Sequence, residues 1–210
     1  MANRFLEIFE DQILVNKIQS RLPYLFQLAE LESSRAGKTG MEVGSVREKI
    51  IVALLIYKFG EQNVETDIPI TEPEVDVRLY GEPLSIKTIT GKNLDGVKII
   101  WTVDAQKALE FYNSYFPRYD ILLIQINWND KGGFYYIPNE VQRRIFNRLG
   151  KENYLKLPKK GTNPRGIEIT KEAMMNLIED SESKKIEINW EKTDIRFNPY
   201  QRWIDLWRLD

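Results

Sequence analysis

Three charged residues in the first half of the chain have types that could perform metal-assisted or acid–base chemistry. Asp76 and Lys87 lie in two short segments of alternating apolar and polar residues, 74–79 and 84–89, and Glu48 precedes both. Carboxylate oxygens bind hard divalent cations, and a lysine can hold or remove a proton at a reacting group. If the fold brings the three side chains together, they form a small acidic site with one cation beside it.

The two alternating segments must pair as a hairpin for Asp76 and Lys87 to meet. Residues 81–83, Gly-Glu-Pro, indicate a turn between two strands. With Tyr80 opposite Pro83, the apolar side chains of both strands share one face, and Asp76 lies directly across from Lys87 on the other face. The alternative interpretation of this pair is a structural salt bridge, which contributes only about 0.2–1 kcal/mol.

Glu48 lies in the first turn of a predicted helix over residues 46–59. This helix is apolar on almost every side and ends at Gly60, so we expect it to be buried. The order Ser45 to Glu48 also fits a capping box, in which the glutamate bonds back to the backbone at the helix start. Glu48 therefore either caps the helix or points toward the hairpin.

The absence of two residue types excludes several kinds of enzyme. The chain has no cysteine and no histidine, which rules out thiolate nucleophiles, cysteine-bound zinc, Ser–His triads and nucleases that depend on histidine. No stretch is long and apolar enough to cross a bilayer, and charges interrupt any signal-peptide core near the first residue. We expect a soluble, cytoplasmic protein with no membrane partner.

The order of the predicted elements, α–β–β–β–α–β at the centre, indicates one α/β domain with a mixed sheet. Residues 3–32 are predicted to form two helices that break at Pro23. No internal repeat or linker divides the chain. We expect a single domain over residues 1–210, with N-terminal helices in 1–40, a core that holds the three candidate residues in 44–137 and a C-terminal elaboration in 138–210.

A helix that supplies Glu48, a strand that supplies Asp76 and an adjacent strand that supplies Lys87 resemble the core of the PD-(D/E)XK nucleases. The family pattern is Pro-Asp on one strand and Asp/Glu-X-Lys on the next. Here Val75 replaces the proline and Ser85 replaces the second carboxylate. In some members the preceding helix supplies the missing carboxylate, and Glu48 is placed to do so. The resemblance implies a restriction-endonuclease-like core, a mixed β-sheet flanked by helices.

Longer segments of the chain resemble Type II restriction endonucleases that cut CGCG to blunt ends. The segments that carry this resemblance are GMEVGSVREKI, EVDVRLYGEPLSIKT and KKGTNPRGIEIT. It implies double-stranded DNA, with CGCG as the target. It also implies a homodimer, because blunt cutting of a palindrome needs two active sites related by a dyad.

The resemblance further implies catalytic residues Glu48, Asp76 and Lys87, with Mg²⁺ as cofactor. Glu48, Asp76 and the backbone carbonyl of Ile86 would be the protein ligands, because Mg²⁺ prefers oxygen. The ion would polarise the scissile phosphate and lower the pKa of a water. Lys87 would position or deprotonate that water and help to neutralise the transition state.

Two polar loops are candidates for DNA contact. The later loop ends a basic run between Glu140 and Arg165, where eight basic residues stand against two acidic ones. Lys160 and Arg165 are the first candidates for guanine, and Met41 in the earlier loop is a candidate wedge between base steps. The alternatives are incidental surface charge and a methionine packed on its own helix. The expected DNA-binding residues are Arg35, Lys38, Met41, Lys159, Lys160, Thr162, Asn163 and Arg165.

Two other functions fit the same residues. One is a repair or junction nuclease that recognises DNA structure, and the other is a DNA-binding domain in which Asp76 and Lys87 form only a salt bridge. The dimer surface is also left open between the N-terminal helices and an aromatic C-terminal helix. The aromatic and aliphatic residues of that helix are Tyr200, Trp203, Ile204 and Trp207.

Overall fold

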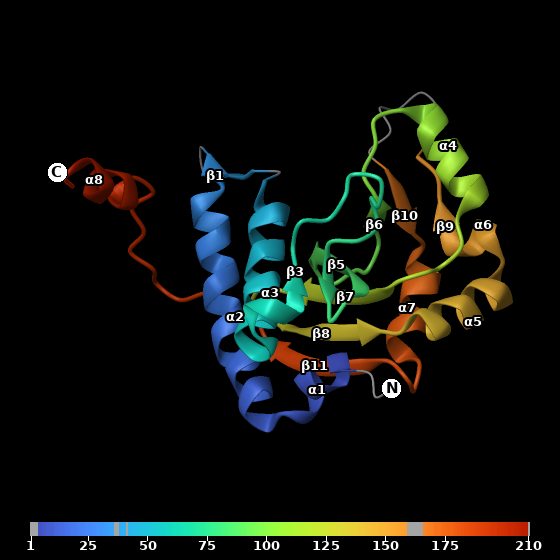
Figure 1. Cartoon of the computed structure of the whole chain (residues 1–210), viewed down its shortest axis with the longest axis horizontal. Helices are drawn as coiled ribbons and strands as arrows, with labels where there is room; N and C mark the ends of the chain where they lie inside the picture. Colours follow the sequence, from blue (N-terminus) through green and yellow to red (C-terminus); the bar gives the residue numbers. More distant parts are fainter. Residues whose placement is uncertain (1–3, 36–37, 41, 159–165, 210) are drawn as a thin grey trace.

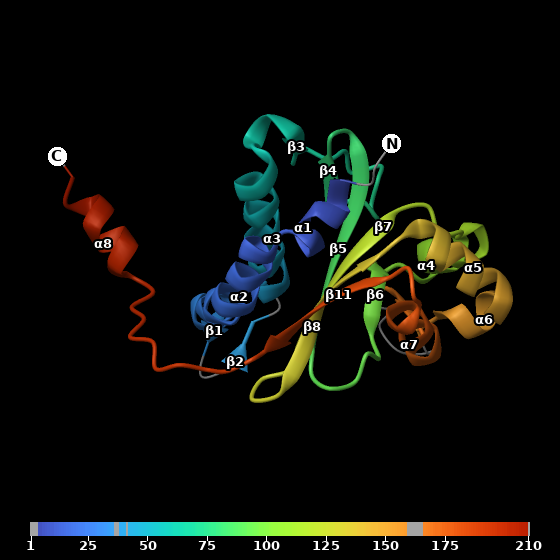
Figure 2. The ribbon, with the colours of Figure 1, turned by 90° about the horizontal axis from the view of Figure 1, so that it is seen from below.

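A six-stranded mixed sheet lies at the centre of the protein, with helices on both of its faces (Figures 1 and 2). The computed structural model describes residues 4–35, 38–40, 42–158 and 166–209. Strands β5 and β7 are parallel, and the other neighbouring pairs are antiparallel, which confirms the predicted α/β class. In spatial order the strands are β11 (Lys184–Asn189), β8 (Lys131–Ile137), β7 (Asp120–Ile126), β5 (Glu82–Thr90), β4 (Val77–Leu79) and β3 (Val64–Glu65).

Strand β7 shows why the sheet needs a cover on each side. Every residue after Asp120 in this strand is buried, because alternate side chains point to opposite faces. Leu122 and Ile124 enter one apolar core, and Ile121 and Leu123 enter the other.

Three N-terminal helices cover the first face. In α2 a stripe at helical spacing, from Leu14 through Ile18 and Leu22 to Phe26, packs into the first core. In α3 the buried stripe is Arg47, Ile51, Leu55 and Phe59. The elements of this side are η1 (Arg4–Leu6), α1 (Glu7–Glu10), α2 (Gln12–Glu32), β1 (Ser34–Arg35), β2 (Lys38–Thr39), α3 (Val43–Phe59) and η2 (Glu61–Asn63).

The second face is covered by a lobe of short helices and a small antiparallel sheet. The sheet has the order β6-β10-β9, and aromatic side chains such as Tyr115, Phe146 and Tyr154 fill the space beside it. The elements of this lobe are β6 (Val97–Ile100), α4 (Ala105–Ser114), α5 (Asn139–Leu149), α6 (Lys151–Tyr154), β9 (Leu155–Lys156), β10 (Ile167–Ile169) and α7 (Lys171–Glu179).

The hairpin of β4 and β5 has a tighter turn than the sequence predicted. Val77 pairs with Leu84 rather than with Ile86, so the predicted register is wrong by two residues. The turn is the pair Tyr80-Gly81, and both residues have positive φ (51° and 82°), as a two-residue hairpin turn of type I′ requires. A shift of two residues leaves every side chain on its predicted face, because the strand period is two.

Two predictions about the helices were wrong, and one of the two alternatives for Glu48 is excluded. The break in the N-terminal segment lies at Asp11, whose carboxylate caps α2 by accepting from the N–H groups of Ile13 and Leu14, and α2 continues through Pro23. Helix α3 begins at Val43, so Ser45 lies inside it and forms no capping box. Nor is α3 buried on all sides, because Tyr57 is 64% exposed.

The last helix, α8 (Gln201–Trp207), stands apart from the body of the protein (Figures 1 and 2). It has no buried residue, although most of its side chains are large and apolar. A search of the described residues found no helix that is long and apolar enough to cross a membrane.

Candidate active site

Asp76 and Lys87 meet in the structure, as the sequence predicted. Asp76 immediately precedes β4, and its N–H donates to the carbonyl of Leu84 (3.0 Å), which holds it against β5. Lys87 Nζ lies 3.0 Å from Asp76 Oδ2. The same oxygen accepts from the backbone N–H of Ile86 (2.6 Å) and from the hydroxyl of Ser85 (3.3 Å). Three donors from one strand therefore fix the carboxylate of Asp76 in place.

Glu48 faces this pair across a cavity of about 690 Å³. Its walls include Glu48 from the first turns of α3, Asp76 before β4, and Ile86 and Lys87 from β5. Burial, and after it the negative charge of Asp76, raise the pKa of Glu48 above its ordinary value, while Lys87 and Lys49 oppose the rise. The two carboxylates are therefore close enough to repel each other, an arrangement that a bound cation would relieve.

The donor set of this cavity suits Mg²⁺. Among the residues that the structure describes, no group of three or more Asp, Glu, His or Cys side chains could hold a metal. Mg²⁺ does not need one, because it usually keeps several waters and binds through one or two carboxylates together with substrate phosphates. Glu48 and Asp76 supply two carboxylates, and the backbone of Ile86 lies in the same wall.

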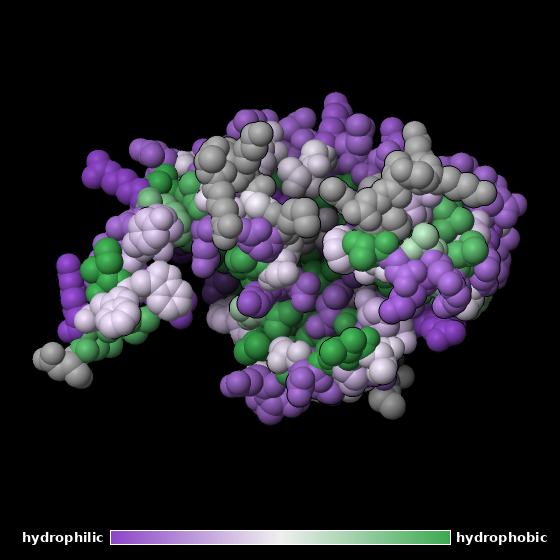
Figure 3. Space-filling view, turned by 90° about the horizontal axis from the view of Figure 1, so that it is seen from above, coloured by the Kyte–Doolittle hydropathy of each residue, from purple (hydrophilic) through white to green (hydrophobic). Residues whose placement is uncertain are grey.

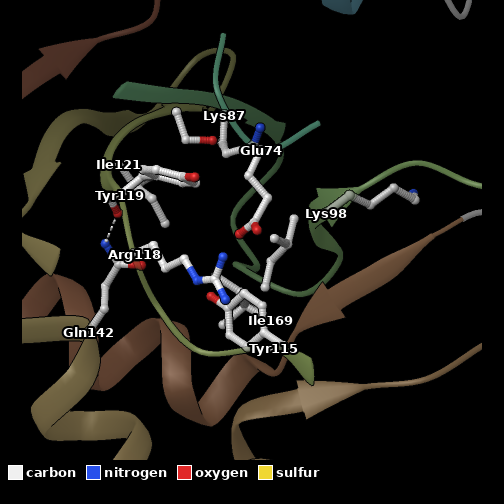
Figure 4. A pocket seen from close by; sticks show the side chains of 11 residues that line it. Glu74, Lys87, Lys98, Tyr115, Arg118, Tyr119, Ile121, Gln142 and Ile169 are labelled. Atoms are coloured by element: carbon white, nitrogen blue, oxygen red, sulfur yellow. Dashed lines mark hydrogen bonds between the residues drawn. The ribbon is translucent and has the colours of Figure 1, made fainter. Parts of the chain in front are cut away.

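A third acid near Lys87, Glu74, was not selected by sequence reasoning. Its carboxylate points toward the guanidinium of Arg118 in a small pocket that Lys87 also lines (Figure 4). Burial raises the pKa of Glu74 to about 7, and the charges of Arg118 and Lys87 oppose that rise. The signal was available, because Glu74 and Asp76 are two residues apart in an alternating segment.

Lys98 is a further cation that the sequence did not single out. It lines both the 690 Å³ cavity and the small pocket of Glu74. It comes from β6, in the lobe that covers the second face of the sheet, and its Nζ lies 3.6 Å from Glu168 Oε1 of β10. Figure 3 looks onto the face above the sheet and shows it hollowed between the side of α2 and α3 and the side of β6 and α4.

Most of the predicted DNA-binding residues lie outside the described residues. These are Met41, Lys159, Lys160, Thr162, Asn163 and Arg165. Arg35 and Lys38 pair with each other in the β1–β2 hairpin just before α3, and only their backbone is described.

The helical part of the basic run makes contacts within the protein. Arg144 forms ion pairs with Asp180 and Glu182, and Lys151 donates to the carbonyl of Asn113. Arg143 donates to the carbonyl of Pro117. These contacts favour the structural interpretation for that part of the run.

Comparisons with known proteins agree with this fold. A family model described as restriction endonuclease ThaI matches residues 8–209. A solved structure described as a restriction endonuclease in complex with substrate DNA is 60% identical, with a TM-score of 0.92, and the match covers 98% of this chain and 99% of that one. No curated protein matches.

The fold, the cavity and these matches define a site-specific DNA nuclease of the Type II restriction class. The chain belongs to the ThaI restriction endonuclease family. Enzymes of this kind generally use a divalent metal ion, which agrees with the acidic cavity.

Proposed function

We propose that this restriction endonuclease cuts double-stranded DNA at CGCG, leaves blunt ends and works as a homodimer with Mg²⁺. The observation that carries the mechanism is the single cavity that Glu48, Asp76 and Lys87 share. The matched structure in complex with substrate DNA supports DNA as the partner. The target sequence rests on the resemblance of the catalytic segments and of residues 159–170 to CGCG-cutting enzymes.

Each residue of the cavity has a separate task in this proposal. Glu48, Asp76 and the carbonyl of Ile86 would hold the ion, which would supply a positive charge to polarise the phosphate and to acidify a water. Lys87 positions that water or, from its neutral form, takes up its proton, and the charged lysine offsets the negative charge that grows on the phosphate. Asp76 also fixes Lys87 through their 3.0 Å contact.

Two loops are proposed to recognise the DNA. Lys160 and Arg165 present donors of the kind that bind guanine O6 and N7, and Lys159, Thr162 and Asn163 supply phosphate and base-edge contacts. Arg35 and Lys38 contact the phosphate backbone of the DNA, and Met41 enters the base stack as an apolar wedge. A Met41→Ala enzyme with unchanged affinity and cutting would contradict the wedge.

The test is digestion of a plasmid with mapped CGCG sites by the parent and by Glu48→Ala, Asp76→Ala and Lys87→Ala proteins. We expect blunt fragments ending at CGCG from the parent alone, and only with Mg²⁺ present. Cutting at other sequences would discard the target and keep the nuclease. Cutting by structure rather than sequence would favour a repair or junction nuclease, and binding without cutting would contradict the mechanism.

A further inference from the structure

The C-terminal arm, residues 194–209, carries an apolar face that is exposed among the described residues of the chain. In α8 and its flanks, Tyr200, Trp203, Ile204 and Trp207 recur at helical spacing on one side, and Gln201, Asp205 and Arg208 lie on the other. Trp207 is 90% exposed and Tyr200 is 69% exposed. An amphipathic helix of this length is marginal in water, so its apolar side needs a surface to pack on.

A groove between α2 and α3 offers a surface of the same character. It has a volume of about 340 Å³ and is lined by residues of both helices. Its rim holds two cations, Lys17 and Arg21. Its lining is otherwise apolar: Ile18, Leu22, Leu25, Ile50, Ala53, Leu54 and Tyr57.

The arm lies clear of the α2 and α3 helices of its own copy. Trp190 is fully buried, and Thr193 is fixed to α2 by two hydrogen bonds with Gln27, of 2.7 and 2.9 Å. Beyond Thr193, the hydrogen bonds and ion pairs of the described residues join only residues of the arm. Figures 1 and 2 agree that α8 then stands clear of α2 and α3, on the side away from the sheet.

We propose that the C-terminal arm packs into the α2–α3 groove of a second copy of this chain, and that the second copy returns the same contact. The inference rests on the proposed homodimer and names its interface. A two-fold dimer repeats every contact, so one exchange covers two apolar faces and two grooves. The exchange also accounts for the exposed Tyr57 and Leu25 on one surface and the exposed tryptophans on the other.

The absence of cysteine makes a clean crosslinking test possible. One chain carries Ala53→Cys in the groove, and a second, longer tagged chain carries Leu206→Cys at the edge of the apolar face of α8. The two proteins are mixed, allowed to exchange subunits and treated with a short bismaleimide. We expect a covalent heterodimer as the main product on a denaturing gel.

Two further samples decide between the possible positions of the arm. A matched control uses Glu152→Cys in place of Ala53→Cys in the first chain. Glu152 is exposed on α6, in the lobe that covers the second face of the sheet, and we expect this control to give only background product. A single chain with both Ala53→Cys and Leu206→Cys should give a product of dimer size, because the two-fold exchange is closed. An internal crosslink of monomer size would overturn the exchange, because the arm would then occupy its own groove.

Sedimentation equilibrium of the full chain supplies the second readout. We expect the parent to be a dimer. The dissociation constant should rise about 30-fold in each of the single variants Trp203→Ala and Trp207→Ala, since buried tryptophans are common interface hot spots. Unchanged dissociation constants, or a monomeric parent, would contradict the exchange.

Cleavage of CGCG plasmids by the same samples separates the two proposals. Cutting without the heterodimer crosslink removes the arm exchange and leaves the proposed function. The crosslink without cutting establishes the exchange and removes the proposed nuclease mechanism.

Discussion

Glu74 shows how an acid can be held near the candidate site at a cost in stability. The folded protein buries its carboxyl beside Arg118 and Lys87, and burial nevertheless raises its pKa from the ordinary value of 4.5 to about 7. The folded state therefore binds this proton more tightly than the unfolded chain does. The stability that this proton contributes is complete below a pH near 4.5 and is lost as the pH rises through about 7.

Glu74→Gln should remove that pH dependence, because the amide stays neutral. Without metal, we expect the variant to lose less stability than the parent between about pH 5 and pH 8, by roughly 1–3 kcal/mol. Urea unfolding at the two pH values measures the difference. Glu191→Gln, at an exposed position, is the matched control. Equal pH slopes in the parent and in Glu74→Gln would contradict the burial of this acid.

At the scale of elements, the pair Arg47–Glu30 fixes the start of α3 beside the cavity. Both side chains are nearly buried, with 6% and 12% exposed. Glu30 also accepts from Trp128 Nε1 (2.7 Å), and Arg47 also donates to Thr90 at the end of β5 (3.0 Å). Because Glu48 follows Arg47 directly, these contacts set the position of the helix turn that carries it.

Arg47→Met should destabilise the protein by about 3–5 kcal/mol, because it leaves the carboxylate of Glu30 buried with fewer partners. Adding Glu30→Leu should restore part of that loss, since the unpaired charge is then gone. Chemical denaturation of both single variants and the double variant measures the coupling. The exposed pair Lys131–Glu187 is the control, and Lys131→Met should cost less than about 1 kcal/mol. If the loss of unfolding free energy in the double variant equals the sum of the losses in Arg47→Met and Glu30→Leu, the two residues are not coupled.

The β4–β5 turn offers a test of backbone strain alone. Gly81 has a φ of 82°, and a Cβ placed there meets no atom within 4 Å. Gly81→Ala should still cost about 1 kcal/mol, because the left-handed conformation is unfavourable for alanine. Gly44, in the first turn of α3, is equally open, and Gly44→Ala should stabilise by about 0.5–1 kcal/mol. Thermal unfolding compares them, and effects of the same sign would contradict this explanation.

The elements of the site could be predicted where a two-residue period decided the outcome. Asp76 and Lys87 lie on the same face of the hairpin in both the predicted and the observed register. Their contact was therefore predicted correctly although the turn was not. That error arose because the positive φ of Tyr80 is uncommon for a residue with a bulky side chain. The helix ends were harder, because Asp11 and Ser45 are both good capping residues and only the packing of α2 and α3 selects between them.

At the scale of the whole molecule, one apolar pattern has two meanings that a sequence cannot separate. The stripe from Leu14 to Phe26 in α2 enters the core, and the stripe from Tyr200 to Trp207 does not. Both repeat at helical spacing. The difference is where the chain goes after Trp190, and this depends on the Gln27–Thr193 contacts between distant parts of the chain.

The proposed dimer makes a prediction about how the two DNA strands are cut. An enzyme with two linked sites cuts both strands during one encounter, so supercoiled plasmid becomes linear with little nicked intermediate. The full-length Trp203→Ser/Trp207→Ser protein should lose the arm contact and keep each cavity, because α8 stands apart from α3 and β5, which line the cavity (Figure 1). We expect nicked circles to accumulate at low enzyme concentration, and linear product to return as the concentration rises and mass action restores the dimer.

Agarose gels of a time course on a plasmid with one CGCG site measure both species, and the Arg202→Ser protein, altered on the polar side of α8, is the control. Direct conversion to linear DNA by the double variant at the lowest active concentration would show that the arm does not hold the two sites together.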